Sequence, residues 1–183
     1  MSRGELVTSA PVIDAVLARH RSAMGPDFAA YRNHAFRVFN VCLAIAGVTS
    51  PEDVEKVAVA AVFHDLGIWT DHTFDYIQPS VALAVEYLTD GSRSNWIPEI
   101  KAMIVNHHKI TSTDRGEDRL VEPFRRADWI DVSRGVRRFG VDRRLIASVF
   151  ATWPAVGFHW RLVELAVERF RRHPLTPLPM VKL

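Results

Sequence analysis

The chain has 183 residues and a nearly balanced charge, with 23 lysines and arginines against 21 aspartates and glutamates. This length fits one globular domain that folds without cross-links, and the single cysteine, Cys42, excludes a disulfide framework. No apolar run approaches the roughly 20 residues of a membrane helix, so we expect no membrane partner. The single cysteine favours a reducing compartment, so we expect a cytoplasmic protein.

The N-terminal half reads as a succession of helices. Apolar residues at helical spacing predict helices over 11–24 and 28–46, and Gly47 closes the second. Ser50, followed by a proline and two acids, is a strong start signal for a helix that runs to about Leu66. The segment 68–78 has no clean period and is expected to be a loop.

Helical signals continue as far as residue 172. Pro79 is expected to open a helix that ends at Asp90, and Asp142 is expected to cap a helix over 143–151. Polar residues 111–116 are expected to form a loop. The other helices predicted in this half begin near 95, span 120–132 and span 157–172.

No alternating strand pattern competes with these helices, so the fold class is all-α. We expect a single helical-bundle-like domain over residues 1–172. Residues 173–183 contain three prolines and are expected to form an extended tail. The apolar residues of the last helix could serve either the core or a homodimer; they are Leu162, Val163, Leu165 and Ala166.

Arginine dominates the C-terminal half, where the segment from Arg119 to Arg172 holds 12 arginines and six acids. Such a surplus could attract phosphates or nucleic acid. The arginines lie in scattered pairs, however, and neither an aromatic RNA-binding signature nor zinc-finger cysteines accompany them. We therefore expect a solvated face and no nucleic-acid partner.

An adjacent histidine and aspartate, His64 and Asp65, lie near the end of a strongly apolar predicted helix. Polar side chains buried there need partners, and a divalent metal is one, because imidazole and carboxylate groups are its usual ligands. His34 and Asp128 similarly interrupt the apolar faces of two other predicted helices. The alternative is a buried hydrogen-bonded network without an ion.

This ordered set of residues resembles the HD-domain superfamily of metal-dependent phosphohydrolases. The resemblance covers about residues 31–132. It rests on an early histidine followed three residues later by arginine, the FHDLG segment, a histidine pair and an Ala-Asp dipeptide. These motifs are His34 with Arg37, residues 63–67, His107-His108 and Ala127-Asp128.

The resemblance implies that His34, His64, Asp65 and Asp128 bind one divalent metal ion, which could be Mn, Fe, Co, Ni, Zn or Mg. The ion would activate a water that attacks a small phosphate ester or nucleotide, and Asp65 could also orient that water. A small phosphate-containing molecule is therefore the expected substrate.

Four further residues complete the expected site. Arg37 lies one helical turn after His34, where it could hold a phosphate or form a surface salt bridge. His107 is a candidate for proton transfer, and His108 and Lys109 are candidates for substrate binding. Neighbouring residues diverge on a helix, so His107 is expected to reach the centre, unless a helix end lets both do so.

The sequence departs from the two-metal members of the superfamily, which commonly carry a histidine before a proline where this chain has Gln78. A second metal is therefore less expected, although Asp71, His72 or Asp75 could substitute. Ile68 stands where the deoxynucleotide-hydrolysing branch has a catalytic glutamate. The alternatives are a di-iron oxygenase, a cyanamide-hydratase-like hydratase and a non-catalytic ligand-binding module that keeps the ion for structure.

Overall fold

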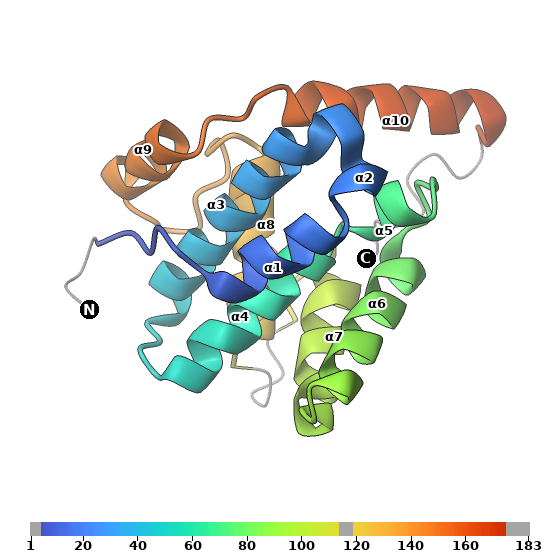
Figure 1. The fold of residues 1–183 in the computed structure, drawn as a ribbon. Helices are drawn as coiled ribbons and strands as arrows, with labels where there is room; N and C mark the ends of the chain where they lie inside the picture. Colours follow the sequence, from blue (N-terminus) through green and yellow to red (C-terminus); the bar gives the residue numbers. More distant parts are fainter. Residues whose placement is uncertain (1–4, 114–118, 175–183) are drawn as a thin grey trace.

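The computed structural model describes residues 5–113 and 119–174, which contain helices and no strand, so the all-α prediction is confirmed (Figure 1). Residues 175–183 of the predicted tail and 114–116 of the predicted loop lie outside the described part. Among the described helices, none is both long and apolar enough to cross a membrane. The helices are α1 (Pro11–Arg19), α2 (Arg21–Met24), α3 (Phe28–Ala46), α4 (Pro51–Phe63), α5 (Gly67–Thr70), α6 (Ile77–Asp90), α7 (Ile97–Asn106), α8 (Val121–Val132), α9 (Arg143–Thr152) and α10 (Phe158–Arg172), with 3-10 turns η1 (Gly25–Asp27) and η2 (Ser94–Trp96).

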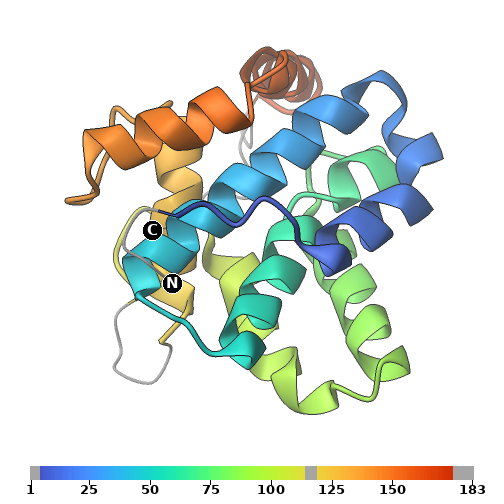
Figure 2. The same cartoon turned by 60° about the vertical axis from the view of Figure 1, so that its left-hand side comes forward.

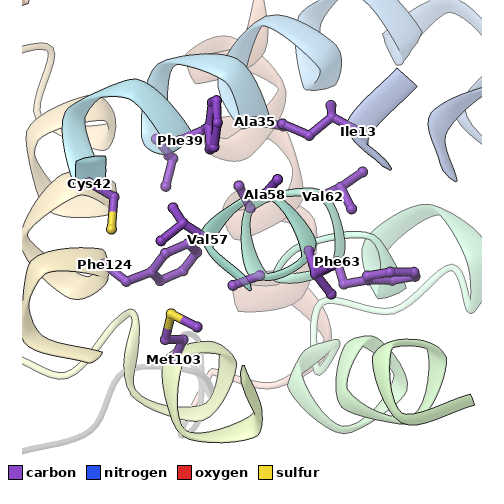
Figure 3. Close-up of a cluster of buried hydrophobic side chains, with 14 of the residues drawn as sticks. Ile13, Ala35, Phe39, Cys42, Val57, Ala58, Val62, Phe63, Met103 and Phe124 are labelled. Carbon is purple, nitrogen blue, oxygen red and sulfur yellow. The ribbon is translucent and has the colours of Figure 1, made fainter. Parts of the chain in front are cut away.

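Helix α4 lies at the centre of the molecule, with α1, α3, α6 and α7 packed around it (Figure 2). Every residue from Val57 to Phe63 is buried, as expected for a helix that is apolar on all sides. Its alanines and valines allow close approach, and Phe39 of α3, Met103 of α7 and Phe124 of α8 fill the spaces around it (Figure 3). Helix α8 packs on α3 and α7, so it also borders this interior.

Several predicted helix ends are confirmed because local chemistry determines them. Ser50 caps α4 by accepting a hydrogen bond from the Asp53 N–H at 3.1 Å. Asp142 caps α9 by accepting one from Arg144 N–H at 2.7 Å. Gly47 ends α3 in the left-handed conformation, with φ 63°.

Other predicted boundaries are wrong. The helix predicted over 11–24 breaks at His20, and the one predicted to reach Leu66 ends three residues earlier, at Phe63. The expected loop 68–78 contains α5 and the start of α6, which begins at Ile77 and not at Pro79. In each case we attribute the position of the helix end to packing against neighbouring helices, which the periodicity of apolar residues does not predict.

Gly67 is the first residue of α5, and the start of α6 lies directly against it. A Cβ atom at Gly67 would lie 2.6 Å from the carbonyl oxygen of Tyr76 and 2.9 Å from Cβ of Pro79. The Gly67 N–H also donates to Ser80 Oγ at 3.0 Å. Only glycine lets the turn after α4 pack this closely on α6.

Gly67→Ala is therefore expected to lower the free energy of unfolding by about 2 kcal/mol, because backbone atoms of α6 must move. Gly91→Ala is the matched control, since a Cβ there meets only two carbonyl oxygens, at 3.3 and 3.9 Å. Urea denaturation of both variants measures the difference. Equal stability of the two variants would contradict the close-packing argument.

Candidate metal centre

Six polar side chains from four parts of the fold converge in the interior. His34 comes from α3, His64 and Asp65 follow α4, His107 and His108 follow α7, and Asp128 comes from α8. The side chains are almost completely buried, and His108, at 15% exposed, is the most accessible. The structure therefore brings together all four sequence-predicted metal ligands and both members of the histidine pair.

A tight turn lets His64 and Asp65 face the same centre. After α4 the backbone continues with short-range hydrogen bonds, from Leu66 N–H to the Phe63 carbonyl at 3.1 Å and from Ile68 N–H to the Asp65 carbonyl at 3.0 Å. These i→i+3 bonds tighten the chain compared with an α-helix. Neighbouring side chains that would diverge by about 100° on a regular helix can then converge.

One group of atoms forms around two imidazole nitrogens. Nε2 of His34 and Nε2 of His64 lie 2.9 Å apart, and Oδ2 of Asp65 lies 3.5 Å from each. Oδ1 of Asp128 lies 3.7 Å from the first nitrogen and 3.6 Å from the second. Ligands held at about 2.1 Å from one ion are themselves about 3–3.5 Å apart, so this group fits a metal ion.

A second group uses the other oxygen of each carboxylate. Oδ1 of Asp65 lies 3.3 Å from Nε2 of His107, and Oδ2 of Asp128 lies 3.5 Å from Nδ1 of His108. Asp65, His107 and His108 each offer a ligand atom within 4.8 Å of the others. Both carboxylates thus lie between two sets of histidines.

Hydrogen bonds at Nδ1 fix the protonation of three imidazoles. His64 donates from Nδ1 to the carbonyl of Ala61 at 2.9 Å, and His107 donates to the carbonyl of Ile104 at 2.5 Å. His34 donates from Nδ1 to Oδ2 of Asp131 at 2.6 Å. Because carbonyl and carboxylate oxygens accept, Nδ1 carries the proton and Nε2 remains available as a ligand.

The residues present fit a cation, because buried polar atoms in the centre lack hydrogen-bond partners among the described residues. These atoms are Oδ1 of Asp65, Nε2 of His107 and both carboxylate oxygens of Asp128. Buried polar groups are rarely left unpaired, and carboxylate oxygens are the costliest to leave so. A bound divalent cation would satisfy these atoms together.

The acidic and basic groups of the centre shift one another's pKa values. Burial raises the pKa of Asp65 and Asp128, but the surrounding histidines outweigh it and lower both values below the ordinary range. Burial lowers the pKa of His34, but Asp131 and Asp65 outweigh it and raise the value to about 9. Burial lowers the pKa of His108 to about 4, and the neighbouring His107 adds to the shift. A metal at this centre would therefore meet ionised carboxylates and a neutral His108, and it would displace a proton from His34.

Arg37 is buried and does not face solvent, so the expectation that it contacts a substrate phosphate is corrected. Its buried guanidinium donates from Nε and Nη2 to Asp131, and from Nη1 to the carbonyls of Trp153 and Pro154 at 3.0 and 3.3 Å. All its donor nitrogens are therefore used inside the protein. Asp131 in turn holds His34, so Arg37 supports a ligand from behind.

Both members of the histidine pair reach the centre, because α7 ends at Asn106 and the pair follows the helix end. His107 is buried, and His108 is the side chain through which the centre approaches solvent. The adjacent Lys109 is half-buried, and its carbonyl accepts hydrogen bonds from Arg125 and Trp129. Contact of Lys109 with a phosphate stays a prediction.

The loop residues offered as substitutes for a missing ligand do not enter the centre. Asp71, His72 and Asp75 are exposed, and so is Gln78, which stands where two-metal members carry a histidine. Tyr76, which the sequence analysis missed, is buried instead, and its hydroxyl lies 2.6 Å from Nε2 of His108. Its only sequence signal is an aromatic residue at the end of a polar segment.

Tyr76→Phe is expected to weaken metal binding roughly tenfold, because the hydroxyl that holds His108 is lost. The fold should be retained, since the ring still packs in the core. Tyr87→Phe, on the helix that Tyr76 precedes and away from the centre, is the matched control. Metal titration of both variants tests this role, and an unchanged metal affinity for Tyr76→Phe would contradict it.

The segment after the histidine pair is held by Glu122 of α8. Its carboxylate accepts hydrogen bonds from Thr113 N–H at 3.0 Å and from two nitrogens of Arg125 at 2.7 Å. Burial raises the pKa of Glu122, but Arg125 and Thr113 outweigh it and hold the value well below its ordinary range. Ionised Glu122 therefore stabilises the folded state.

Glu122→Gln is expected to lower the free energy of unfolding by about 2 kcal/mol at pH 7. Because the folded-state pKa is depressed, this stabilisation is present above the unfolded pKa of about 4.3 and is lost as the pH falls below it. The gap between wild type and variant should therefore shrink in acid. Urea denaturation across pH checks this against Glu52→Gln, an exposed control; a gap independent of pH would contradict it.

A family model described as HD domain matches residues 31–133, more than half of the chain. The matched range begins three residues before His34 and ends five residues after Asp128, so it contains all six converging side chains. Comparisons with curated proteins and with solved structures give no match.

Proposed function

The chain belongs to the HD domain family, and on that premise we propose that it is a metal-dependent phosphohydrolase acting on a small phosphate ester or nucleotide. A cytoplasmic location is part of the proposal, since the only cysteine, Cys42, is buried and unpaired. Most members of this family are metal-dependent hydrolases. Of the two parts of the proposal, metal binding is the one that the geometry of the centre supports most directly.

One observation carries the proposal. Asp65 and Asp128 each direct one oxygen toward His34 and His64 and the other toward the pair that follows α7. Three carboxylate oxygens of Asp65 and Asp128 have no hydrogen-bond partner among the described residues, whereas a structural hydrogen-bonded network would pair them. This pattern favours a metal-binding role over the ion-free alternative.

A bound divalent ion would lower the pKa of a coordinated water and stabilise charge on a phosphoryl group. His34, His64, Asp65 and Asp128 are the residues that would hold it. Asp65 also has an oxygen directed at His107, so this pair is placed to orient a water or carry its proton. His108, the most accessible histidine of the centre, is placed on the side from which a substrate would enter.

The second group of ligand atoms gives specific support to a two-ion alternative. Asp65, His107 and His108 could hold another ion, with the carboxylates between the two metals. This arrangement supports the di-iron oxygenase alternative, although Gln78 replaces a histidine that two-metal members commonly carry. Metal stoichiometry separates the proposals: two irons per chain would favour the oxygenase, and one ion per chain would favour the phosphohydrolase.

The test combines elemental analysis of the purified protein with a screen of phosphomonoesters and nucleotides in Mn, Co or Ni. We expect stoichiometric metal and turnover that chelation removes and added metal restores. Metal without any phosphate release across the screen would reject phosphohydrolysis and leave the oxygenase, the hydratase or a ligand-binding module. Protein that retains no metal under any of these conditions would reject the metal centre itself.

A further inference from the structure

The chain that follows the family-matched range returns to the metal centre. Residues 153–159, here termed the return segment, join the end of α9 to the start of α10. Asn33 of α3 donates from its side-chain amide to the carbonyl of Pro154 at 2.8 Å, and the Trp153 ring stacks on Phe36 with centroids 5.4 Å apart. Figure 1 shows the start of α10 beside the first turns of α3. The return segment is thus fixed to the helix that carries one of the predicted metal ligands.

The return segment contacts every member of the series of side chains that ends in His34. In that series Arg37 holds Asp131, and Asp131 accepts the hydrogen bond from Nδ1 of His34. Two carbonyls at the start of the segment accept hydrogen bonds from Arg37 Nη1 at 3.0 and 3.3 Å. Nε2 of His159 donates to the backbone carbonyl of Asp131 at 2.9 Å. Phe158 contacts His34 itself, so the segment reaches this ligand directly as well as through its supports.

Phe158 covers one face of the His34 ring. The two rings are stacked, with centroids 4.0 Å apart and an angle of 16° between their planes. Both side chains are buried, Phe158 at 1% exposed and His34 at 0%. Leu162 and Leu165, one and two turns later on α10, pack against the core and hold the helix in this position. Phe158 therefore belongs to the interior and closes this side of His34 to solvent.

A stacked ring restrains a motion that the hydrogen bond to Asp131 leaves free. That bond, at 2.6 Å, fixes Nδ1 of His34, but the imidazole can still swing about this one anchored atom. A flat ring packed against its face blocks the motion, so Nε2 stays directed at the other ligand atoms. The electron-rich face of phenylalanine also favours an imidazole that carries positive charge, which a bound cation would increase. The stack therefore supports the orientation in which His34 acts as a ligand.

We propose that Phe158 is a positioning residue for His34, and that the return segment completes a metal centre whose other parts lie within the family-matched range. The inference rests on the proposed function, in which His34 is a metal ligand. Loss of the Phe158 ring should let the imidazole move away from the position in which its Nε2 meets His64 and Asp65. The affinity of the centre for a metal should then fall, although none of the ligands has been changed.

Titration of the metal-free full chain with Co²⁺, followed by calorimetry and by the absorption spectrum of the bound ion, tests the proposal. Phe158→Leu keeps an apolar side chain but removes the flat ring, and we expect it to weaken Co²⁺ binding roughly tenfold. Phe39→Leu is the matched control, since it replaces a fully buried phenylalanine of α3 that packs on α4 (Figure 3). The control should lower the melting temperature by a similar amount and leave Co²⁺ affinity and spectrum unchanged. Phe158→Met, which also lacks a flat ring, takes the place of the leucine variant if that variant does not fold.

A second measurement, on the metal-free protein, follows the Nδ1 proton of His34 by NMR. Its short hydrogen bond to Asp131 should give a downfield, slowly exchanging signal. Phe158→Leu should speed this exchange, and Phe39→Leu should not.

Failure of this inference can be told apart from failure of the proposed function. Wild-type Co²⁺ affinity and wild-type proton exchange in Phe158→Leu would overturn the positioning role and leave the metal centre standing. Equal losses of Co²⁺ affinity in Phe158→Leu and Phe39→Leu would also overturn it, because the effect would then be a general loosening of the fold. A wild type that binds no Co²⁺ would reject the proposed function instead, and unchanged proton exchange would in that case reject the positioning role as well.

Discussion

Replacing Asp65 with asparagine is expected to abolish metal retention and to lower kcat/KM roughly 1,000-fold or more. One oxygen of Asp65 lies 3.5 Å from Nε2 of both His34 and His64, and the other lies 3.3 Å from Nε2 of His107. The amide keeps the shape of the side chain but removes the charge that would hold a cation. Among the described residues, Asp65 is the member shared by the group His34, His64 and Asp65 and the group Asp65, His107 and His108.

The Asp65→Asn variant should remain folded, which separates loss of metal from loss of structure. Burial raises the pKa of Asp65, but the surrounding histidines outweigh it and hold the value below the ordinary range, so the ionised side chain stabilises the metal-free fold. The metal-free variant should therefore melt somewhat lower than the metal-free wild type while remaining folded. Added metal should raise the melting temperature of the wild type alone, because only the wild type binds it.

Elemental analysis, thermal melts with and without metal, and the phosphatase assay of the wild type measure these effects together. Asp75→Asn is the matched control, because it neutralises an exposed acid in the loop beyond the same turn. The control should keep metal, melting temperature and turnover. If the Asp65→Asn variant retained stoichiometric metal and activity, Asp65 could not be a metal ligand.

The sequence predicts best what is determined locally. Ser50 and Asp142 cap helices through their own side chains, and Gly47 ends one through its backbone, so neighbouring residues suffice to place these boundaries. The turn that follows Phe63 is different, because its geometry brings two neighbouring side chains to one centre. Periodicity predicts that the helix continues there, and the structure shows that it does not.

Pairings between distant residues explain why part of the centre could not be read from the sequence. Arg37 and Asp131 are 94 positions apart, and each has an ordinary alternative as a surface ion pair. The hydroxyl of Tyr76 meets His108 across 32 positions, from a segment with no periodic pattern. The metal ligands could be placed because their order resembles a known family, whereas these supporting contacts follow no motif.

Arg37→Met is expected to lower the free energy of unfolding by about 3–5 kcal/mol, because it breaks a buried ion pair and leaves Asp131 charged in the interior. For a chain of this size, the melting temperature should fall by about 10 °C. The matched control on the same helix is Arg32→Met, which removes a half-exposed ion pair with Asp14 and should cost about 0.5 kcal/mol.

Thermal and urea unfolding of both variants, together with steady-state kinetics, separates the two roles considered for Arg37. A guanidinium that supports His34 through Asp131 should, when lost, lower stability and metal affinity, with kcat following metal occupancy. A guanidinium that held a phosphate would instead raise KM while leaving the melting temperature unchanged. The buried position of Arg37 and its bonds to the Trp153 and Pro154 carbonyls favour the first outcome.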